Sequence, residues 1–400
     1  MKSEWTKKKL SDIADFNPRE TIKKGAIAKK IPMDVLRPFY RDIPYYGEEC
    51  FSGGTKFRNG DTIMARITPC LENGKTAQVS ILNDGEVGFG STEYIVFRAK
   101  EGIADKDYLY YLVCSPEVRE LAIKSMVGSS GRQRVQTDVV KNLEIDVPPL
   151  SEQEKIGSYL KAFDDKIALN DRINKNLLQQ LDALYQELST RDTWDITPIG
   201  ELAEKIAMGP FGSNIKVSTF VPYGVPIISG NHLRGYFLEE PSYNYITEEH
   251  AERLKNSVVY PGDVVFTHAG NIGQVAMIPD GCDYPKYVLS QRQFYLRCNT
   301  EKLIPEYVTL FFHSKEGQHE LLSYANQTGV PSIAQPASNL KKISLPVPPL
   351  QIQEEWAALV RPIISQYQQN KLEIRTLSTT RDTLLPKLMS GELDVSNIDL

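Results

Sequence analysis

The sequence predicts an α+β protein of two similar halves, each a globular domain followed by one long helix. Three observations predict this fold. The chain resembles itself at a spacing of about 200 residues. Short β-branched runs between Gly and Pro residues indicate strands in each half. A sustained 3-4 spacing of apolar residues after each domain is typical of a coiled coil. We therefore expect two globular domains related by a pseudo-twofold repeat, separated by two long antiparallel helices.

The internal repeat rests on several matches that occur in the same order in both halves. The residues that follow each motif are also similar in the two halves. The spacing between matching motifs changes slightly along the chain, which indicates loop insertions within a shared fold. The matches are Trp5 with Trp194, Gly60-Asp61 with Gly262-Asp263, Ser91-Thr92-Glu93 with Ser290-Gln291-Arg292, Val147-Pro148-Pro149-Leu150 with Val347-Pro348-Pro349-Leu350, and Gln153-Glu154 with Gln353-Glu354.

Each globular domain is expected to mix short strands with helices. Strands are predicted at residues 62–65, 94–97, 263–266 and 293–296. Helical patterns occupy residues 10–14, 105–126, 199–203 and 305–324. The boundaries expected from these patterns are a domain at 1–150, a helix at 151–190, a domain at 191–350 and a helix at 351–400.

The long helices carry a narrow apolar face that needs a partner. The first runs from Ser151, a candidate N-cap, to about Ser189, and such a helix is on the order of 55–60 Å long. A helix with this face is unstable alone in water, so pairing with the equivalent helix is predicted. The alternative is that each helix packs only on its own domain. The predicted positions are Leu160, Phe163, Ile167, Asn170, Asn174, Leu177, Leu181, Leu184 and Leu188, and in the second helix Val360, Ile363, Tyr367, Asn370, Ile374, Leu377, Arg381, Leu384 and Leu388.

Composition narrows the classes of function. The chain has 46 Lys and Arg against 51 Asp and Glu, a net charge of −5. An acidic balance argues against a free-standing DNA-binding protein, so any contact with nucleic acid must be local or shared with a partner. No apolar run is long enough to span a membrane. The five scattered cysteines indicate neither a disulfide framework nor a zinc site. We expect a cytoplasmic protein.

Motifs for catalysis are not found. Gly74-Lys75-Thr76 resembles the end of a phosphate-binding loop, but Pro69 stands where that motif needs glycine. The Asn/Asp-Pro-Pro-Tyr/Phe motif of amino-methyltransferases is missing, and Pro148-Pro149 follows Val147. The five histidines show no ligand spacing for a metal. We predict no catalytic, cofactor-binding or metal-binding residue in this chain.

The whole chain resembles the specificity (S, HsdS) subunit of type I restriction–modification systems. The resemblance rests on the twofold layout and on three phrases, Val147–Ile156, Val347–Glu354 and Leu384–Leu393. It implies two target-recognition domains that each read one half of a bipartite site in double-stranded DNA, with the helices as spacers. It also implies two modification (methyltransferase) subunits and additional restriction subunits as partners. S-adenosylmethionine, ATP and Mg²⁺ are expected only on those partners.

Candidate DNA contacts lie on polar loops at matching places of the two halves. Arg, Lys, Asn, Gln, Ser and Thr suit base edges and phosphates, and small residues let the backbone approach. Each loop is also consistent with an ordinary exposed turn. The candidates are Arg66, Asn73, Lys75, Ser129, Ser130, Arg132, Gln133, Arg134, Ser213, Asn214, Lys216, Asn231, Arg234, His268, Asn271, Gln291, Arg292, Gln327, Thr328 and Ser332. Arg132-Gln133-Arg134 is predicted to correspond to Ser332-Ile333-Ala334.

Two other functions remain open from the sequence. One is a self-sufficient restriction or modification enzyme with unusual motifs, which the missing catalytic motifs disfavour. The other is a scaffold that binds protein partners but no DNA.

Overall fold

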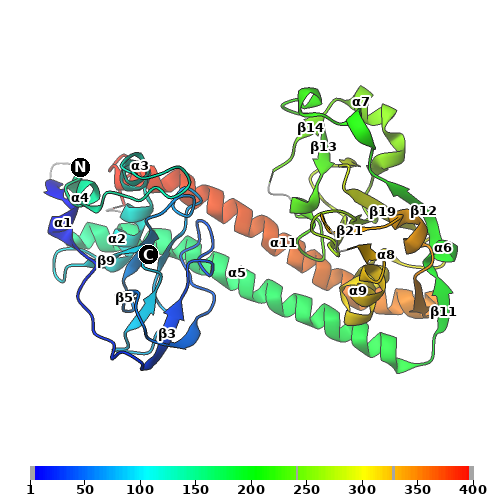
Figure 1. Cartoon of the computed structure of the whole chain (residues 1–400), viewed down its shortest axis with the longest axis horizontal. Helices are drawn as coiled ribbons and strands as arrows, with labels where there is room; N and C mark the ends of the chain where they lie inside the picture. Colours follow the sequence, from blue (N-terminus) through cyan, green and yellow to red (C-terminus); the bar gives the residue numbers. More distant parts are fainter. Residues whose placement is uncertain (1–4, 240–241, 327–328, 396–400) are drawn as a thin grey trace. The chain divides into compact units, whose positions relative to one another are not determined.

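The computed structural model describes residues 5–239, 242–326 and 329–395 (Figure 1). The chain divides into two compact units. Unit 1 comprises Met1–Ile173 and Gln369–Leu400, and unit 2 comprises Asn174–Gln368. Each unit therefore holds a globular domain from one half of the chain together with segments of both long helices.

The globular part of unit 1 contains two four-stranded sheets. One has the strand order β2-β9-β6-β7 and is antiparallel, and the other has the order β4-β3-β8-β5 with β3 and β8 parallel. A separate antiparallel pair joins β1 to β10. The elements are β1 Thr6–Lys9, α1 Leu10–Ile13, β2 Ala14–Phe16, β3 Ile27–Ile31, β4 Gly47–Cys50, β5 Thr55–Phe57, β6 Thr62–Ala65, β7 Thr76–Gln78, β8 Gly88–Gly90, β9 Tyr94–Ala99, α2 Lys106–Cys114, α3 Pro116–Lys124, α4 Thr137–Lys141 and β10 Glu144–Val147.

Unit 2 repeats this arrangement of strands. Its sheets have the orders β12-β19-β16-β17 and β14-β13-β18-β15, again with one parallel pair, and β11 joins β22. The predicted repeat and the α+β class are thereby confirmed. The elements are β11 Asp195–Pro198, α6 Ile199–Leu202, β12 Ala203–Met208, η2 Gly212–Asn214, η3 Val217–Thr219, β13 Val225–Ile228, η4 Gly230–His232, β14 Tyr245–Ile246, α7 Glu248–Arg253, η5 Lys255–Ser257, β15 Val258–Val259, β16 Val264–Thr267, β17 Val275–Met277, β18 Tyr287–Leu289, β19 Gln293–Cys298, α8 Pro305–His313, α9 Lys315–Leu322, β20 Ala325–Asn326, β21 Ser332–Ile333, α10 Pro336–Leu340 and β22 Ser344–Val347.

The two predicted helical patterns at 105–126 and 305–324 are each broken into two helices. The break falls at Ser115 and Ser314, whose ψ values of 153° and 162° are extended. Pro116 then begins α3, where its missing N–H costs no helical bond. The Ser314 hydroxyl accepts a bond from the N–H of Gly317 and caps α9. Each break lets a mostly buried helix, α2 or α8, lie against its sheet while the next helix turns outward.

The repeated Gly-Asp motif has a structural role. Gly60 and Gly262 turn the chain with φ of +89° and +88°, a region that suits glycine. The following carboxylates accept the Nε–H and Nη2–H of an arginine on the next strand of the sheet, Asp61 from Arg98 at 2.7 Å and Asp263 from Arg297 at 2.8 and 2.6 Å. Because both carboxylates are buried, the fork fixes the turn to the sheet in each unit.

One glutamine at the start of each long helix ties that helix to its domain. Gln153 is 1% exposed, and its carbonyl accepts the N–H of Asp105, the N-cap residue of α2, at 3.0 Å. Its amide donates to the carbonyls of Ile103 and Pro148. Gln353, 200 residues later and 0% exposed, makes the same three bonds with Ile304, Lys302 and Pro348. The glutamine after the Val-Pro-Pro-Leu motif is therefore a buried bridge between domain and helix.

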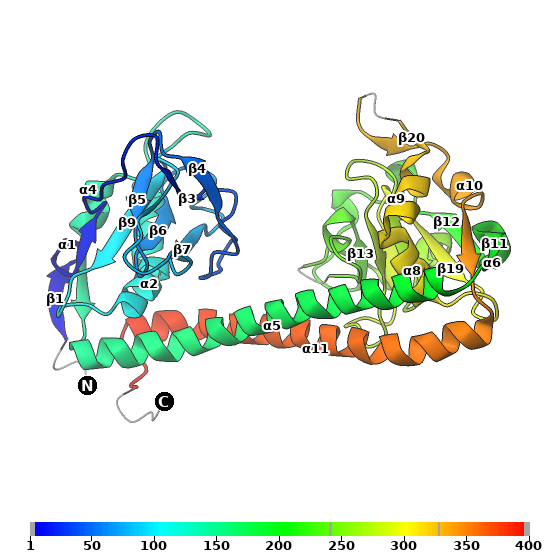
Figure 2. The ribbon, with the colours of Figure 1, turned by 90° about the horizontal axis from the view of Figure 1, so that it is seen from below.

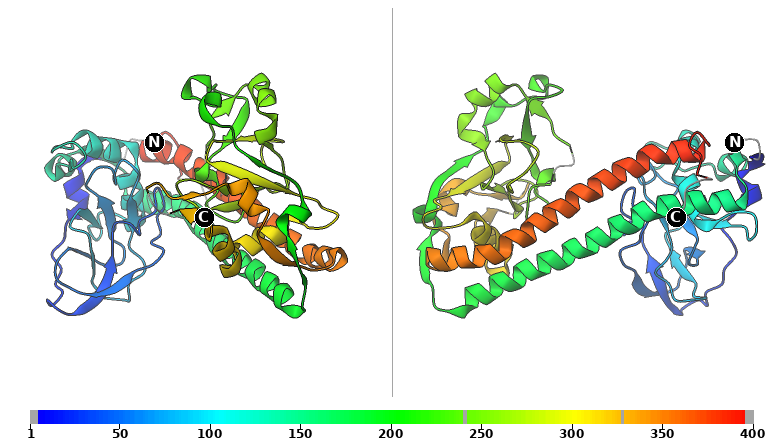
Figure 3. Two further views of the ribbon diagram at one scale, coloured as in Figure 1. Left: turned by 45° about the vertical axis from the view of Figure 1, so that its right-hand side comes forward. Right: turned by 180° about the vertical axis from the view of Figure 1, so that it is seen from behind.

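The two long helices are α5 (Leu150–Arg191) and α11 (Leu350–Met389). Within each unit their segments lie side by side and run in opposite directions (Figure 1; Figure 3). In unit 1, Asn170 donates to Glu373 at 2.8 Å, and in unit 2 the Trp356 indole donates to the Leu184 carbonyl at 3.0 Å. Among the described residues, no helix is long and apolar enough to cross a membrane.

Burial along the two helices repeats at a spacing of 200 residues. The buried positions of α5 are Gln153, Ile156, Gly157, Leu160, Asp164, Ile167, Asn170, Asn174, Leu181, Tyr185 and Leu188, and those of α11 are Gln353, Trp356, Ala357, Val360, Ile364, Tyr367, Asn370, Ile374, Arg381, Leu385, Leu388 and Met389.

This pattern corrects the predicted face at three positions of each helix. Leu177 and Leu377 are only half-buried. Phe163, Leu184, Ile363 and Leu384 are also half-buried, and there the buried residue comes one position later. The reason is that this face contacts the globular domain as well as the other helix, as the ring of Tyr185 does on Tyr307 at 5.4 Å. Ser151 is not the N-cap either, because the helix begins at Leu150 and the Pro149 carbonyl accepts the first helical N–H bonds.

A buried ion pair joins the two helices in unit 1. Asp164 and Arg381 have side chains that are 4% and 8% exposed and are hydrogen-bonded to each other. The Tyr111 hydroxyl donates to the second oxygen of Asp164 at 2.6 Å. Burial raises the pKa of Asp164, and the Arg381 guanidinium opposes that rise. The residues at the equivalent places of unit 2 are Ile364 and Leu181, both in its apolar core.

Loss of the glutamine bridge should destabilise one unit at a time. Gln153→Ala leaves the Asp105 N–H and two carbonyls of unit 1 without their partner, and an unsatisfied buried group costs about 1–3 kcal/mol. Hydrogen exchange should accelerate in α2 of unit 1, and Gln353→Ala should act in the same way on α8 of unit 2. Gln180→Ala, at an exposed position of α5, is the matched control. Equal effects of the two bridge variants on both units would contradict this assignment.

Removing one partner of the buried ion pair should destabilise unit 1 more than removing both partners. Arg381→Leu alone leaves an uncompensated carboxylate and should destabilise unit 1 by about 3–5 kcal/mol. The combination Asp164→Ile, Arg381→Leu and Tyr111→Phe reproduces the apolar packing of unit 2 and should recover most of that loss. Thermal unfolding of the two variants measures the difference. A combined variant as unstable as Arg381→Leu would show that the pair itself stabilises the fold.

Candidate nucleic-acid interface

Three loops of unit 1 meet at one end of the sheet β2-β9-β6-β7. They are residues 66–75 between β6 and β7, residues 91–93 between β8 and β9, and residues 125–136 between α3 and α4. Backbone bonds hold them together. The Arg66 N–H donates to the Glu93 carbonyl at 2.9 Å, and the Val135 N–H donates to the Arg66 carbonyl at 2.9 Å. Val127 and Arg134 pair across the third loop, so its tip projects as a short hairpin.

Unit 2 forms the same junction with different side chains. The His268 N–H donates to the Arg292 carbonyl at 2.9 Å, and the Ile333 N–H donates to the His268 carbonyl at 2.8 Å. The third loop again closes as a hairpin, between β20 and β21, which Figure 2 shows at the side of unit 2 away from its helix segments. The backbone bonds therefore make three positions equivalent: Arg66 with His268, Glu93 with Arg292, and Arg134 with Ser332.

This equivalence corrects the predicted alignment of the third loop. Arg134 corresponds to Ser332, not to Ala334, because Ala269 pairs with Ser332 as Ile67 pairs with Arg134. The segment from this loop to the Val-Pro-Pro-Leu motif is two residues longer in the second half, which hides the shift from a comparison at a fixed spacing.

The side chains of unit 1 form a charged group at this junction. Arg134 donates from Nε and Nη2 to the Glu93 carboxylate at 3.0 and 2.6 Å, and Arg66 Nε lies 4.0 Å from the same carboxylate. The Arg134 guanidinium lowers the pKa of Glu93. Arg132 is exposed, as are Ser129 and Ser130, and its side chain makes no hydrogen bond or ion pair with the described part of the chain. Gln133 is half-buried.

Lys75 points away from this group. Its ammonium donates to the Met33 carbonyl at 2.8 Å, and in unit 2 the Gln274 amide makes the equivalent bond to the Gly230 carbonyl at 3.0 Å. This bond ties the loop after the parallel strand to the sheet in both units, so it gives Lys75 a structural role. Asn73, two residues earlier, is exposed.

In unit 2 a fourth loop joins the junction. The Gln291 amide donates to the carbonyls of Gly212 and, at 3.4 Å, of Ile215, which brings residues 212–216 beside His268 and Arg292. Asn214 and Lys216 are exposed there, and Ser213 belongs to η2. Arg292 is exposed, and its Nη1 lies over Gly270 of the 268–273 loop, whose Asn271 is also exposed.

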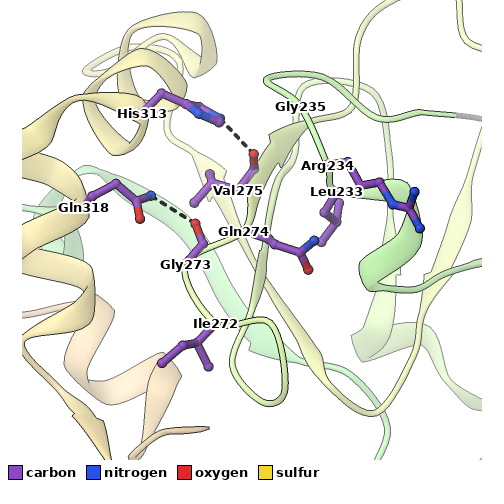
Figure 4. A pocket seen from close by; sticks show the side chains of 9 residues that line it. All are labelled: Leu233, Arg234, Gly235, Ile272, Gly273, Gln274, Val275, His313 and Gln318. Carbon is purple, nitrogen blue, oxygen red and sulfur yellow. Dashed lines mark hydrogen bonds between the residues drawn. The ribbon is translucent and has the colours of Figure 1, made fainter. Parts of the chain in front are cut away.

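Asn231 and Arg234 lie on a neighbouring loop. Both are exposed, and Arg234 Nη2 donates to the Asn231 side chain at 3.1 Å. Arg234 also lines an open pocket of about 420 Å³ together with Gln274, His313 and Gln318 (Figure 4). Burial lowers the pKa of His313 to about 4, and its Nε2 bonds to the Val275 carbonyl at 2.8 Å.

The junction holds most of the predicted residues, but not all of them can be placed. Ser332 is half-buried beside Ala269, whereas Gln327 and Thr328 lie outside the described residues. Glu93 was not predicted, because a carboxylate is an unusual candidate beside phosphates. The signal that could have identified Glu93 is its alignment with the candidate Arg292 at a spacing of 199 residues. Within the described ranges, His, Cys, Asp and Glu side chains do not gather in threes that could hold a metal ion.

The two halves of the chain each match the same family of known proteins. The family model for the type I restriction modification DNA specificity domain matches residues 2–179 and again residues 191–376. The EcoAI specificity subunit of a type I restriction enzyme from Escherichia coli is 33% identical over 211 residues, which are 51% of this chain and 35% of that protein. The MjaVIII specificity subunit from Methanocaldococcus jannaschii is 22% identical over 332 residues, covering 79% of this chain and 76% of that protein.

The match to the Escherichia coli relatives spans about a third of their own length, 35% for EcoAI and 32% for the EcoEI specificity subunit. A solved structure, the S subunit of a type I restriction–modification system from M. genitalium, resembles the fold with a TM-score of 0.60. It is 15% identical in sequence, and the comparison covers 96% of both chains.

Proposed function

Because this chain belongs to the type I restriction–modification DNA specificity family, we propose that it is the subunit that selects the DNA target of such a complex. The domain of residues 1–150 reads one half of a bipartite, asymmetric site in double-stranded DNA, and the domain of residues 191–350 reads the other half. The family match to both halves of the chain supports this assignment.

The observation that carries the proposal is the pair of equivalent loop junctions. The same backbone bonds hold the loops in both units, yet the side chains differ: Arg66, Glu93 and Arg134 in unit 1 stand where His268, Arg292 and Ser332 stand in unit 2. A shared frame with different polar side chains is what two readers of unlike sequences need, since base edges differ in their donors and acceptors.

Partner proteins supply the chemistry in this proposal. Two modification subunits dock on the chain and methylate adenine, and restriction subunits complete the nuclease, so S-adenosylmethionine, ATP and Mg²⁺ belong to the partners. The chain itself is non-catalytic. Its net charge of −5 fits a reader that shares the neutralisation of phosphates with other subunits.

The long helices act as spacers between the half-sites. Helix α5 has 42 residues and, at 1.5 Å a residue, is about 60 Å long, more than the ~34 Å between half-sites one DNA turn apart. The buried pattern that α5 shares with α11 gives both helices the same register, so one cannot change length without the other.

The decisive experiment is a map of methylated bases in host DNA with and without this gene. We expect a two-part motif with N6-methyladenine in both halves that disappears on deletion. Purification of the tagged chain should recover a methyltransferase subunit. Methylation of DNA by the purified chain alone would contradict a non-catalytic role, and recovery of partners without any change in the methylated bases would favour a protein-only scaffold.

Charge reversal at Arg132 should weaken DNA binding without changing the target. Arg132 is exposed on the hairpin tip and its side chain makes no bond with the described residues, as suits contact with a phosphate. Arg132→Glu should reduce affinity about equally for all sequences and lower the slope of log K against log salt by about 1. Arg172→Glu, at an exposed arginine of α5, is the matched control. A changed base preference would instead mark Arg132 as a base contact.

A further inference from the structure

Each unit places an exposed guanidinium at one of the three equivalent positions of its loop junction, but the two guanidinium groups come from different loops. In unit 1 the guanidinium belongs to Arg134 on the third loop, whose side chain is 44% exposed. In unit 2 the equivalent position is Ser332, and the guanidinium belongs to Arg292 on the loop before β19. The position of Arg292 is taken in unit 1 by Glu93. The arginine therefore lies on a different loop in each unit, although the backbone bonds of the two junctions are equivalent.

Bonds hold the Arg134 guanidinium in a defined orientation, whereas Arg292 lies beside a glycine that leaves room for its guanidinium. Glu93 binds Arg134 through Nε and Nη2, and Nη1 bonds to the Arg132 carbonyl at 3.4 Å, so the plane of the group is set by three bonds. Arg292 lies over Gly270, where a side chain would come within 3.4 Å of its Nη1. With φ of +86°, Gly270 also holds a backbone conformation that other residues rarely adopt.

A planar, oriented guanidinium has a preferred partner in DNA. Arginine donates two parallel bonds to O6 and N7 of guanine in the major groove, the commonest base-specific contact. A lysine carries the same charge but lacks the rigid planar fork, so it holds this geometry less well. The oriented Arg134 is therefore suited to guanine rather than to phosphate alone, and Arg292 presents the same planar group at the second junction.

We propose that Arg134 and Arg292 each read one guanine, in the first and second half-site respectively, and that Glu93 positions Arg134 for this contact. This inference rests on the proposed function and adds to it the base and the residues that select it. Because the two arginines come from different loops, the guanine occupies a different place in each half-site.

The test is a selection of bound sequences from DNA randomised in both half-sites, with the full chain in complex with its modification subunit. Arg134→Lys should lower the preference for guanine at one base pair of the first half by about 5- to 150-fold, the equivalent of about 1–3 kcal/mol. The second half should be unchanged, so it serves as an internal control. Arg292→Lys should do the reverse. Arg172→Lys, exposed on α5, should leave both halves unaltered.

Glu93→Gln distinguishes a positioning role from a merely structural one. It keeps the size and a hydrogen-bond acceptor but removes the charge, so the complex should still form and the guanine preference of the first half should fall less than in Arg134→Lys. The transplant Glu93→Arg with Arg134→Ser, which copies unit 2, should move the guanine to another place in the first half.

The results of this selection distinguish failure of the proposed function from failure of the guanine assignment. If the unaltered complex selects no two-part motif, the proposed function fails and this inference fails with it. If it selects such a motif but the lysine variants select the same motif, or lose affinity equally for all sequences, only the inference is overturned. A loss of guanine confined to one half in each variant supports it.

Discussion

The buried amide of Gln153, with its counterpart Gln353, is the contact on which each globular domain depends for its attachment to a long helix. It satisfies the N–H of the residue that caps the domain's central helix and two carbonyls on the approach to the long helix. Buried backbone groups need such partners, and water does not reach them here. This glutamine therefore fixes the globular domain to the start of its long helix in each unit.

In both units, backbone bonds set the shape of the loop junction, whereas exposed side chains set its chemistry. Bonds between backbone groups define the loop junction, and the buried Asp61–Arg98 and Asp263–Arg297 forks support it from the turn before β6 and β16. None of these bonds depends on the exposed side chains of the loops. Those side chains can therefore differ between the units while the backbone of the junction stays the same.

The layout of the fold could be predicted from the sequence because its signals are periodic. Repetition at about 200 residues and the apolar spacing of the helices predicted two domains, the strands at 62–65 and 94–97, and the paired helices. The details that failed depend on tertiary contacts. Periodicity cannot show that Asp164 is buried by Tyr111 and Arg381, or that Glu93 holds Arg134. The predicted alignment of the third loop was wrong at Ser332 because an insertion shifts the spacing. Spacing alone also could not show that the Lys75 ammonium bonds to the Met33 carbonyl.

The buried pair of Asp164 and Arg381 has a consequence for chains that meet during assembly. The internal repeat gives both helices the same pattern of buried positions, so pairing of α5 with α5, or of α11 with α11, of another molecule competes with the observed pairing. The first pairing would bury Asp164 against the position of Leu181, and the second would bury Arg381 against Ile364, each charge without a partner. Only the pairing of α5 with α11 neutralises both charges. The asymmetry at this one position thus favours the pairing of α5 with α11 over the pairing of two like helices.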